Sequence, residues 1–148
     1  MRISKSIIYL FIFILSISGS FSLAEDYSDS DITKVVMLGS GNPFPDPKRS
    51  GPSVAIVVNG VPYLFDAGAG VWQATGAATP KYGGTIKALE SGNISKVFIT
   101  HLHSDHVVGL PSLILLPWAL GREAPLEVWG PPGTEHMIKH LVEAYRED

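Results

Sequence analysis

The 148-residue sequence contains no cysteine. This absence excludes disulfide bonds, thiolate ligands for zinc, a cysteine nucleophile and a lipid-modified cysteine behind an export signal. The sequence also lacks an excess of positive charge, because eleven Lys and Arg residues stand against fourteen Asp and Glu residues. It has no stripe of basic residues, which is the electrostatic footprint of a nucleic-acid-binding protein. We therefore expect no nucleic-acid partner.

A long apolar run occurs only near the N-terminus. Arg2 and Lys5 precede an apolar run over residues 7–17, and Ser22-Leu23-Ala24 forms a small-x-small cleavage site. This order predicts a signal peptide over residues 1–24. The run is shorter than the roughly 20 apolar residues of a bilayer-spanning helix, although an uncleaved membrane anchor is the alternative. We expect an exported protein, periplasmic or secreted, with no stable membrane association once the signal is removed.

Removal of the signal would change the charge balance. The two basic residues of the signal are the only charges before Glu25, so the remaining segment carries nine basic and fourteen acidic residues, a formal net charge of −5. Residues 25–33 are polar and acidic, which predicts a flexible lead-in. The folded domain is expected over residues 34–148.

Short strands alternating with helices predict an α/β layered fold for this domain. The Asn59-Gly60 pair between two apolar runs is a strong hairpin signal. A helix over 111–120 should be buried and kinked at Pro117, and Thr134 should cap the last helix. The other expected elements are strands over 34–38, 53–58, 61–66, 97–100 and 126–129, a loop with a helical turn or two over 67–84, and a short helix over 85–91.

The most informative segment is Thr100-His101-Leu102-His103-Ser104-Asp105-His106. Imidazole and carboxylate groups are good ligands for zinc and similar ions, and four of them fall within six residues here. His101 and His103 point to the same side of an extended segment and can share one metal ion. Asp105 and His106 follow as the chain turns into a helix and can face a second metal. The segment therefore predicts a site for two metal ions.

This His-x-His-x-Asp-His segment at a strand end resembles the signature of the metallo-β-lactamase superfamily. The chain is most similar to the ribonuclease Z and arylsulfatase-like branch, and the resemblance extends over most of the segment after the signal. It includes, in order, Leu38-Gly39-Ser40-Gly41-Asn42-Pro43, Arg49-Ser50-Gly51-Pro52-Ser53, the Asp-x-Gly-x-Gly turn from Asp66 to Gly70, Gly109-Leu110-Pro111 and Trp129-Gly130-Pro131. The resemblance implies an αββα sandwich of which only the N-terminal half is present.

The resemblance also implies roles for individual residues. His101 and His103 would bind one zinc ion and Asp105 and His106 the other, with other divalent metals as alternatives. A water or hydroxide that bridges the metals would attack phosphorus, sulfur or a carbonyl carbon, and Asp105 could orient this nucleophile as a catalytic residue. Asp66 and Thr100 would hold the ligands in position. For Asp66 a turn residue bonded to its own backbone is an equal alternative.

The implied activity is dizinc hydrolysis of a small phosphodiester or sulfate ester. An exported lactamase or lactonase, and an inactive truncated remnant that binds metal, are the alternatives. Transfer RNA 3′ processing is disfavoured by the export signal, by the acidic balance and by Ala69, where the ribonuclease branch tends to carry glutamate. The second histidine, bridging aspartate and final histidine of the family do not occur before Asp148. We therefore expect a fragment or a natural truncation that is inactive alone; a homodimer of the full-length protein is compatible with this.

Overall fold

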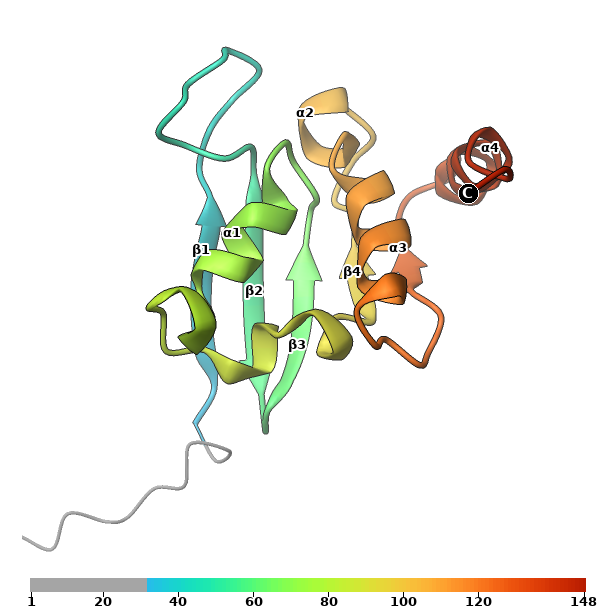
Figure 1. The fold of residues 1–148 in the computed structure, drawn as a ribbon. Coiled ribbons are helices and arrows are strands. Elements are labelled where there is room, and N and C mark those ends of the chain that lie inside the picture. The colour runs from blue at the N-terminus through green and yellow to red at the C-terminus, as the bar shows by residue number, and fades with distance from the viewer. Residues whose placement is uncertain (1–31) are drawn as a thin grey trace, which may run out of the picture.

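A computed structural model describes residues 32–148 (Figure 1). The predicted signal peptide and most of the predicted lead-in lie outside these residues. A five-stranded sheet has the order β1-β2-β3-β4-β5. Its first three strands pair antiparallel, and β3, β4 and β5 pair parallel. The strands are β1 (Lys34–Gly39), β2 (Ser53–Val58), β3 (Val61–Phe65), β4 (Lys96–Phe98) and β5 (Glu127–Trp129). All five predicted strands are present, although β4 ends two residues earlier than expected.

The turn between β2 and β3 confirms the predicted hairpin. Val58 pairs with Val61, so the two residues between them make the turn. Asn59 has φ 49° and Gly60 has φ 76°. Positive φ at both central positions is the requirement of a type I′ turn, whose twist matches that of the flanking strands.

The helices lie mainly over one face of the sheet, with α1 and α3 crossing it in Figure 1. Helix α3 corresponds to the predicted buried helix, and α1 with the short turn η1 corresponds to the helical turns expected within 67–84. No helix in the described part of the chain is long and apolar enough to span a membrane. The helical elements are α1 (Val71–Ala77), α2 (Ser104–Val107), α3 (Leu110–Ala119), α4 (Thr134–Ala144), η1 (Pro80–Tyr82), η2 (Lys87–Leu89) and η3 (Ser91–Asn93).

Two local predictions were wrong. Residues 85–91 do not form one helix, because the Ile86 N–H donates to Ala78 at 2.9 Å and leaves Ile86 with a non-helical backbone. The buried side chain of Leu89 then fixes the short turn η2 against the core. Thr134 does not cap α4 either. Its hydroxyl donates to the Pro131 carbonyl at 2.8 Å, and Gly133 with φ 102° precedes the helix instead.

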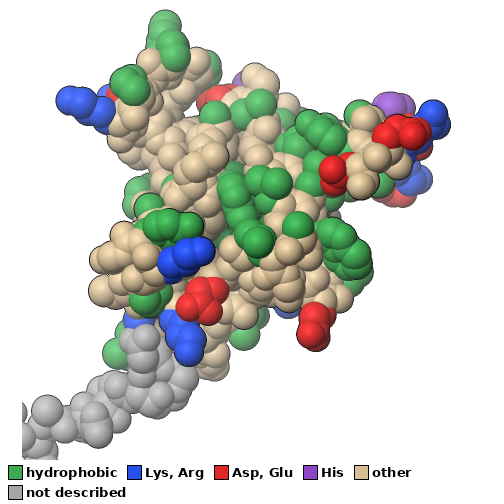
Figure 2. All heavy atoms as spheres, in the orientation of Figure 1, with side chains coloured by type: hydrophobic (Ala, Val, Ile, Leu, Met, Phe, Trp, Pro, Cys, Tyr) green, Lys and Arg blue, Asp and Glu red, His purple; other side chains and the backbone are tan. Residues whose placement is uncertain are grey.

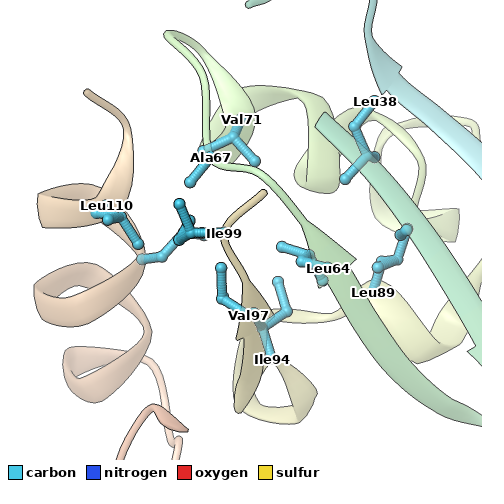
Figure 3. Packing of buried hydrophobic residues seen from close by; sticks show 11 residues of the cluster. Leu38, Leu64, Ala67, Val71, Leu89, Ile94, Val97, Ile99 and Leu110 are labelled. Carbon is cyan, nitrogen blue, oxygen red and sulfur yellow. The ribbon is translucent and has the colours of Figure 1, made fainter. Parts of the chain in front are cut away.

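The core lies between the sheet and the helical layer. Leu64 and Val97 pair across β3 and β4, and both are fully buried (Figure 3). Val71 from α1 and Leu110 from α3 reach the same cluster from the helical side. Leu64 and Val97 point to the same face of the sheet, since neighbouring side chains of a strand alternate between its two faces. The core therefore joins the parallel strands to the helices on either side of the predicted metal-binding segment.

The opposite face of the sheet is also apolar. Paired residues form a continuous row across it, and the rings of Phe65 and Phe98 stack at 5.2 Å while those of Phe98 and Trp129 stack at 4.7 Å. Met37 at the other end of the row is 65% exposed. The row consists of Met37, Val54, Phe65, Phe98 and Trp129. Its exposure at both ends means that no segment among residues 32–148 covers this face completely.

A buried arginine compensates for the proline inside α3. Pro117 has no N–H and so cannot donate to the carbonyl of Leu113 one turn earlier. The Arg122 guanidinium donates to that carbonyl at 2.6 Å and to the Ile114 carbonyl at 2.7 Å. Arg122 is only 6% exposed, and burial lowers the pKa of its side chain. The arginine thus supplies the hydrogen bond that the proline removes.

We predict that Arg122→Met lowers the free energy of unfolding by about 2–3 kcal/mol, because it leaves the buried Leu113 carbonyl without a donor. The loss should be smaller in a Pro117→Ala background, since alanine restores the backbone N–H that can donate to the Leu113 carbonyl. Urea unfolding of the four proteins of this double-mutant cycle measures the coupling. Arg146→Met at an exposed ion pair is the matched control and should change stability by less than about 0.5 kcal/mol. Equal losses in both backgrounds would contradict this account of Arg122.

Candidate metal centre

The predicted metal-binding segment begins where β4 leaves the sheet. The Ile99 N–H still donates to Trp129 on β5 at 2.7 Å, and beyond it Thr100 bonds to Asp66 instead. His103 precedes α2 in an extended conformation, and Asp105 and His106 lie within that short helix. The segment therefore stands at the carboxyl ends of the parallel strands β3 and β4, which is the edge where open α/β sheets bind ligands.

Asp66 connects this segment to the end of β3. Its carboxylate accepts hydrogen bonds from the Thr100 N–H at 2.8 Å, from the Thr100 hydroxyl at 2.8 Å and from Nδ1 of His106 at 2.8 Å. Asp66 is 7% exposed and has a left-handed backbone with φ 62°. Its side chain thus bonds to residues 34 and 40 positions further along the chain. This is the geometry expected of a residue that orients metal ligands.

The hydrogen bond to Asp66 determines which nitrogen of His106 carries a proton. An ionised carboxylate can only accept, so Nδ1 of His106 is the donor. In the neutral ring Nε2 then has a free lone pair, which is the form in which imidazole binds a metal. Nε2 of His106 lies 3.6 Å from Oδ2 of Asp105, the residue predicted to share its metal.

The same reasoning extends to His101 through Thr100. The Thr100 hydroxyl proton is directed to Asp66, so the hydroxyl oxygen is left to accept from Nδ1 of His101 at 3.0 Å. In the neutral ring of His101, Nε2 then has the free lone pair, as in His106. The rings of His101 and His106 have centroids 4.0 Å apart, and those of His101 and His103 are 4.7 Å apart. The buried carboxylate of Asp66 thus orients two imidazoles: that of His106 directly and that of His101 through the Thr100 hydroxyl.

The donor set fits zinc in its chemistry but supplies only part of a coordination shell. Neutral imidazole and carboxylate are zinc ligands, and two of the imidazoles have their Nδ1 atoms committed to other partners. Within residues 32–148, however, no three His, Asp or Glu side chains are arranged to hold a metal ion together. A catalytic zinc usually has three protein ligands. A zinc site built on the predicted pairs His101 with His103 and Asp105 with His106 would therefore need further ligands.

Close backbone contacts hold α2 beside the end of β3. The Ala67 N–H donates to the His106 carbonyl at 2.7 Å, and the Gly109 N–H donates to the Ala67 carbonyl at 2.8 Å. A Cβ atom on Gly68 would lie 2.4 Å from the Gly51 carbonyl carbon and 2.7 Å from the Asp105 carbonyl oxygen. Only glycine fits at this contact. The Asp-x-Gly-x-Gly motif from Asp66 to Gly70 predicted a turn here. It did not predict that the turn packs against the backbone of Asp105.

Residues 33–126 match the model of the family described as anti-Pycsar protein Apyc1. The chain belongs to this family. Similar curated proteins carry the name ribonuclease Z. The protein of Mycobacterium marinum is 35% identical over 118 residues, and that of Mycolicibacterium gilvum is 33% identical over 118 residues. Each match covers 78% of this chain but only 39% and 38% of the respective relative, so the chain spans about two fifths of their length.

Two solved structures resemble this Apyc1 family chain. Human tRNase Z, short form, matches with a TM-score of 0.64 and 33% identity over 76% of this chain and 40% of that structure. The metallo-β-lactamase fold protein YhfI from Bacillus subtilis matches with a TM-score of 0.56 and 19% identity over 73% of this chain and 42% of that structure, a likeness of fold alone. The predicted superfamily, its ribonuclease Z-like branch and the partial N-terminal coverage are confirmed. The metal-binding roles of the individual residues stay predictions.

We predict that Asp66→Asn weakens zinc binding by this Apyc1 family protein by about 10–100-fold, the usual effect of removing a group that orients a ligand. Asn has only one accepting oxygen, so when that oxygen accepts from the Thr100 N–H, the amide NH2 group faces Nδ1 of His106 and cannot accept from it. The imidazole would then move its proton to Nε2 or lose the hydrogen bond. Competition with a chromophoric zinc chelator measures the affinity. Asp148→Asn at the exposed last residue is the control, and unchanged zinc affinity in Asp66→Asn would contradict the assignment.

A second prediction concerns the glycine contact. Gly68→Ala should lower the free energy of unfolding by about 1–3 kcal/mol, because the new methyl group forces two backbone segments apart. Gly76→Ala makes the same chemical change inside α1, where a Cβ atom would meet only the Tyr82 ring at 3.7 Å. That variant should be more stable by about 0.5–1 kcal/mol. Thermal unfolding of both variants separates the two effects, and a stable Gly68→Ala protein would exclude the tight contact.

Proposed function

We propose that this chain supplies the first ligand pairs of a two-zinc hydrolase that cleaves a small phosphodiester. The observation that carries the proposal is the arrangement around Asp66, which leaves Nε2 of both His101 and His106 free to bind a metal. His101 and His103 would hold one zinc ion, and Asp105 and His106 the other. Bound zinc would supply positive charge that polarises the ester and lowers the pKa of water.

The residues of this chain have separate tasks in this mechanism. Asp66 and Thr100 keep the protons on the Nδ1 atoms of two histidines, so that these rings stay oriented when substrate arrives. Asp105 would orient the attacking water by accepting its proton, with its carboxylate next to Nε2 of His106. None of these residues has the task of protonating the leaving oxygen, so the mechanism requires a further acidic group.

Phosphodiester chemistry is supported by the names of the relatives. Proteins called ribonuclease Z act on RNA, whose backbone is a phosphodiester, and they are 33–35% identical to this chain. Our proposal retains a small-molecule substrate, because the chain has a net negative charge. It also retains export, because residues 1–24 have the pattern of a signal peptide. Sulfate esters, lactams, lactones and precursor tRNA are the alternatives that an assay must separate.

The family match favours a second candidate role. Residues 33–126 match a family named for an anti-Pycsar protein, so the whole protein would act against a Pycsar system. Co-expression with an active Pycsar system tests this role, since the protein should suppress the output of that system. This role and phosphodiester hydrolysis are compatible, because the first describes a biological effect and the second a reaction.

The test of the proposed reaction uses the protein as its gene encodes it, supplied with zinc. We expect turnover of bis-p-nitrophenyl phosphate, and little or none of p-nitrophenyl sulfate, a cephalosporin or precursor tRNA. His101→Ala and His106→Ala should each lower kcat/KM at least about 100-fold, because loss of a ligand exceeds loss of a group that orients one. His140→Ala on the exposed face of α4 is the matched control.

Each contrary result has a distinct meaning. Cleavage of only the sulfate ester or only the cephalosporin would replace the phosphodiester assignment with that chemistry. Cleavage of precursor tRNA in preference to the small diester would overturn the small-molecule proposal. Full activity in His101→Ala and His106→Ala would reject the metal site itself.

A further inference from the structure

A cavity of about 630 Å³ opens beside the proposed metal centre. One wall is the loop between β1 and β2, residues 42–51, which projects beyond the sheet edge in Figure 1. The other wall includes Ala69 and Gly70 of the turn after β3, and Ser104, Asp105 and Val108 around α2. The cavity thus shares Asp105 with the proposed reaction site, but most of its lining comes from a loop that the mechanism has not used.

Prolines and hydrogen bonds within the projecting loop restrict its backbone. Prolines at positions 43, 45 and 47 restrict the backbone. The Asp46 carboxylate accepts from the Lys48 N–H at 2.9 Å and from Nε of Arg49 at 2.8 Å, and these two donors hold the pKa of Asp46 below its usual value. The Gly41 N–H donates to the Ser50 carbonyl at 2.8 Å and closes the base of the loop. A stiff loop can present side chains to a ligand with little loss of entropy.

The side chains that this loop presents are an aromatic ring and a cation. Phe44 is 79% exposed, the largest exposure among the large hydrophobic residues of the described chain. Lys48 is exposed and has no ion-pair partner among residues 32–148, whereas the charge of Arg49 is offset by Asp46. Figure 2 shows apolar and basic side chains together on this loop. An exposed ring on a rigid loop at a cavity is typical of a binding surface.

We propose that this cavity binds the part of the substrate that carries a planar ring, with Phe44 stacking on the ring and Lys48 attracting the negative charge of the ester. The substrate class is therefore an anionic ester with an aryl group or a nucleobase. This inference rests on the proposed function for the position of the ester near Asp105. To that function it adds recognition of the planar ring of the substrate, with Phe44 as a specificity-determining residue.

The experiment measures equilibrium binding by titration calorimetry on the zinc-loaded full protein, with probes that it does not consume. Phenylphosphonate should bind about two- to twelvefold more tightly than methylphosphonate, because a stacked pair of rings contributes about 0.5–1.5 kcal/mol. Phe44→Leu should abolish this preference and leave the affinity for methylphosphonate unchanged. Tyr82→Leu is the matched control, since Tyr82 is 65% exposed and lies outside the cavity.

A second pair of probes identifies the source of the ring. Adenosine 5′-monophosphate compared with ribose 5-phosphate measures recognition of a nucleobase, as the phosphonate pair measures recognition of a simple aryl group. The proposal is supported if, in either pair, the probe with a ring binds more tightly and Phe44→Leu removes this difference. The pair that shows the difference identifies the ring as a nucleobase or a simple aryl group. Lys48→Gln should weaken all four probes about two- to fivefold, and less so at high salt, as expected for an exposed charge.

Three results would overturn the inference. They are failure of every probe to bind, equal affinity within both pairs, and a preference that survives in Phe44→Leu. Failure of the proposed function is distinguishable from these results. If bis-p-nitrophenyl phosphate is not cleaved but phenylphosphonate binding depends on Phe44, the cavity recognises aromatic anions without that reaction. If the diester is cleaved and Phe44 has no effect, only the present inference is lost.

Discussion

The buried carboxylate of Asp66 is the group on which the arrangement of the metal centre depends. A buried charge is costly unless hydrogen-bond donors surround it, and here Thr100 and His106 provide those donors. Since a carboxylate can only accept, it also decides where the protons of two imidazoles reside. The left-handed backbone of Asp66 is maintained by its N–H bond to Phe98 and by the Ser53 hydroxyl, which donates to its carbonyl. Strain of this kind is common at functional sites.

Glycine contacts allow the same end of the sheet to carry both the ligand segment and the projecting loop. The Gly51 N–H donates to Ala69 and the Gly68 N–H to Pro52, so two backbone hydrogen bonds join the base of the loop to the turn after β3. Gly68 also touches the backbone at Asp105. The wall of the proposed substrate cavity and the proposed metal ligands are therefore connected through the same closely packed backbone segments.

Among residues 32–148, the apolar face of the sheet opposite the helical layer is left partly open. The aromatic row from Phe65 to Trp129 faces away from α1 and α3, and its ends are exposed. A sheet buries an apolar face against another layer, which in a sandwich is a second sheet. The matched region is 39% of the Mycobacterium marinum relative, so that relative has ample length for the other layer. If the predicted pairs His101 with His103 and Asp105 with His106 bind zinc, they would also need further ligands, because a catalytic zinc usually has three protein ligands.

Features with a local cause could be determined from the sequence alone. Alternating apolar residues specified the strands, Asn59-Gly60 specified the hairpin, and the histidine spacing with its family resemblance identified the superfamily. Tertiary contacts decided the rest. The bond from Ile86 to Ala78 replaced an expected helix, and the bond between Asp66 and His106 joins residues 40 positions apart. The cavity beside Phe44 likewise combines three separate segments. Contacts of this kind leave no periodic pattern in the sequence, because the number of residues between the two partners depends on how the whole chain packs.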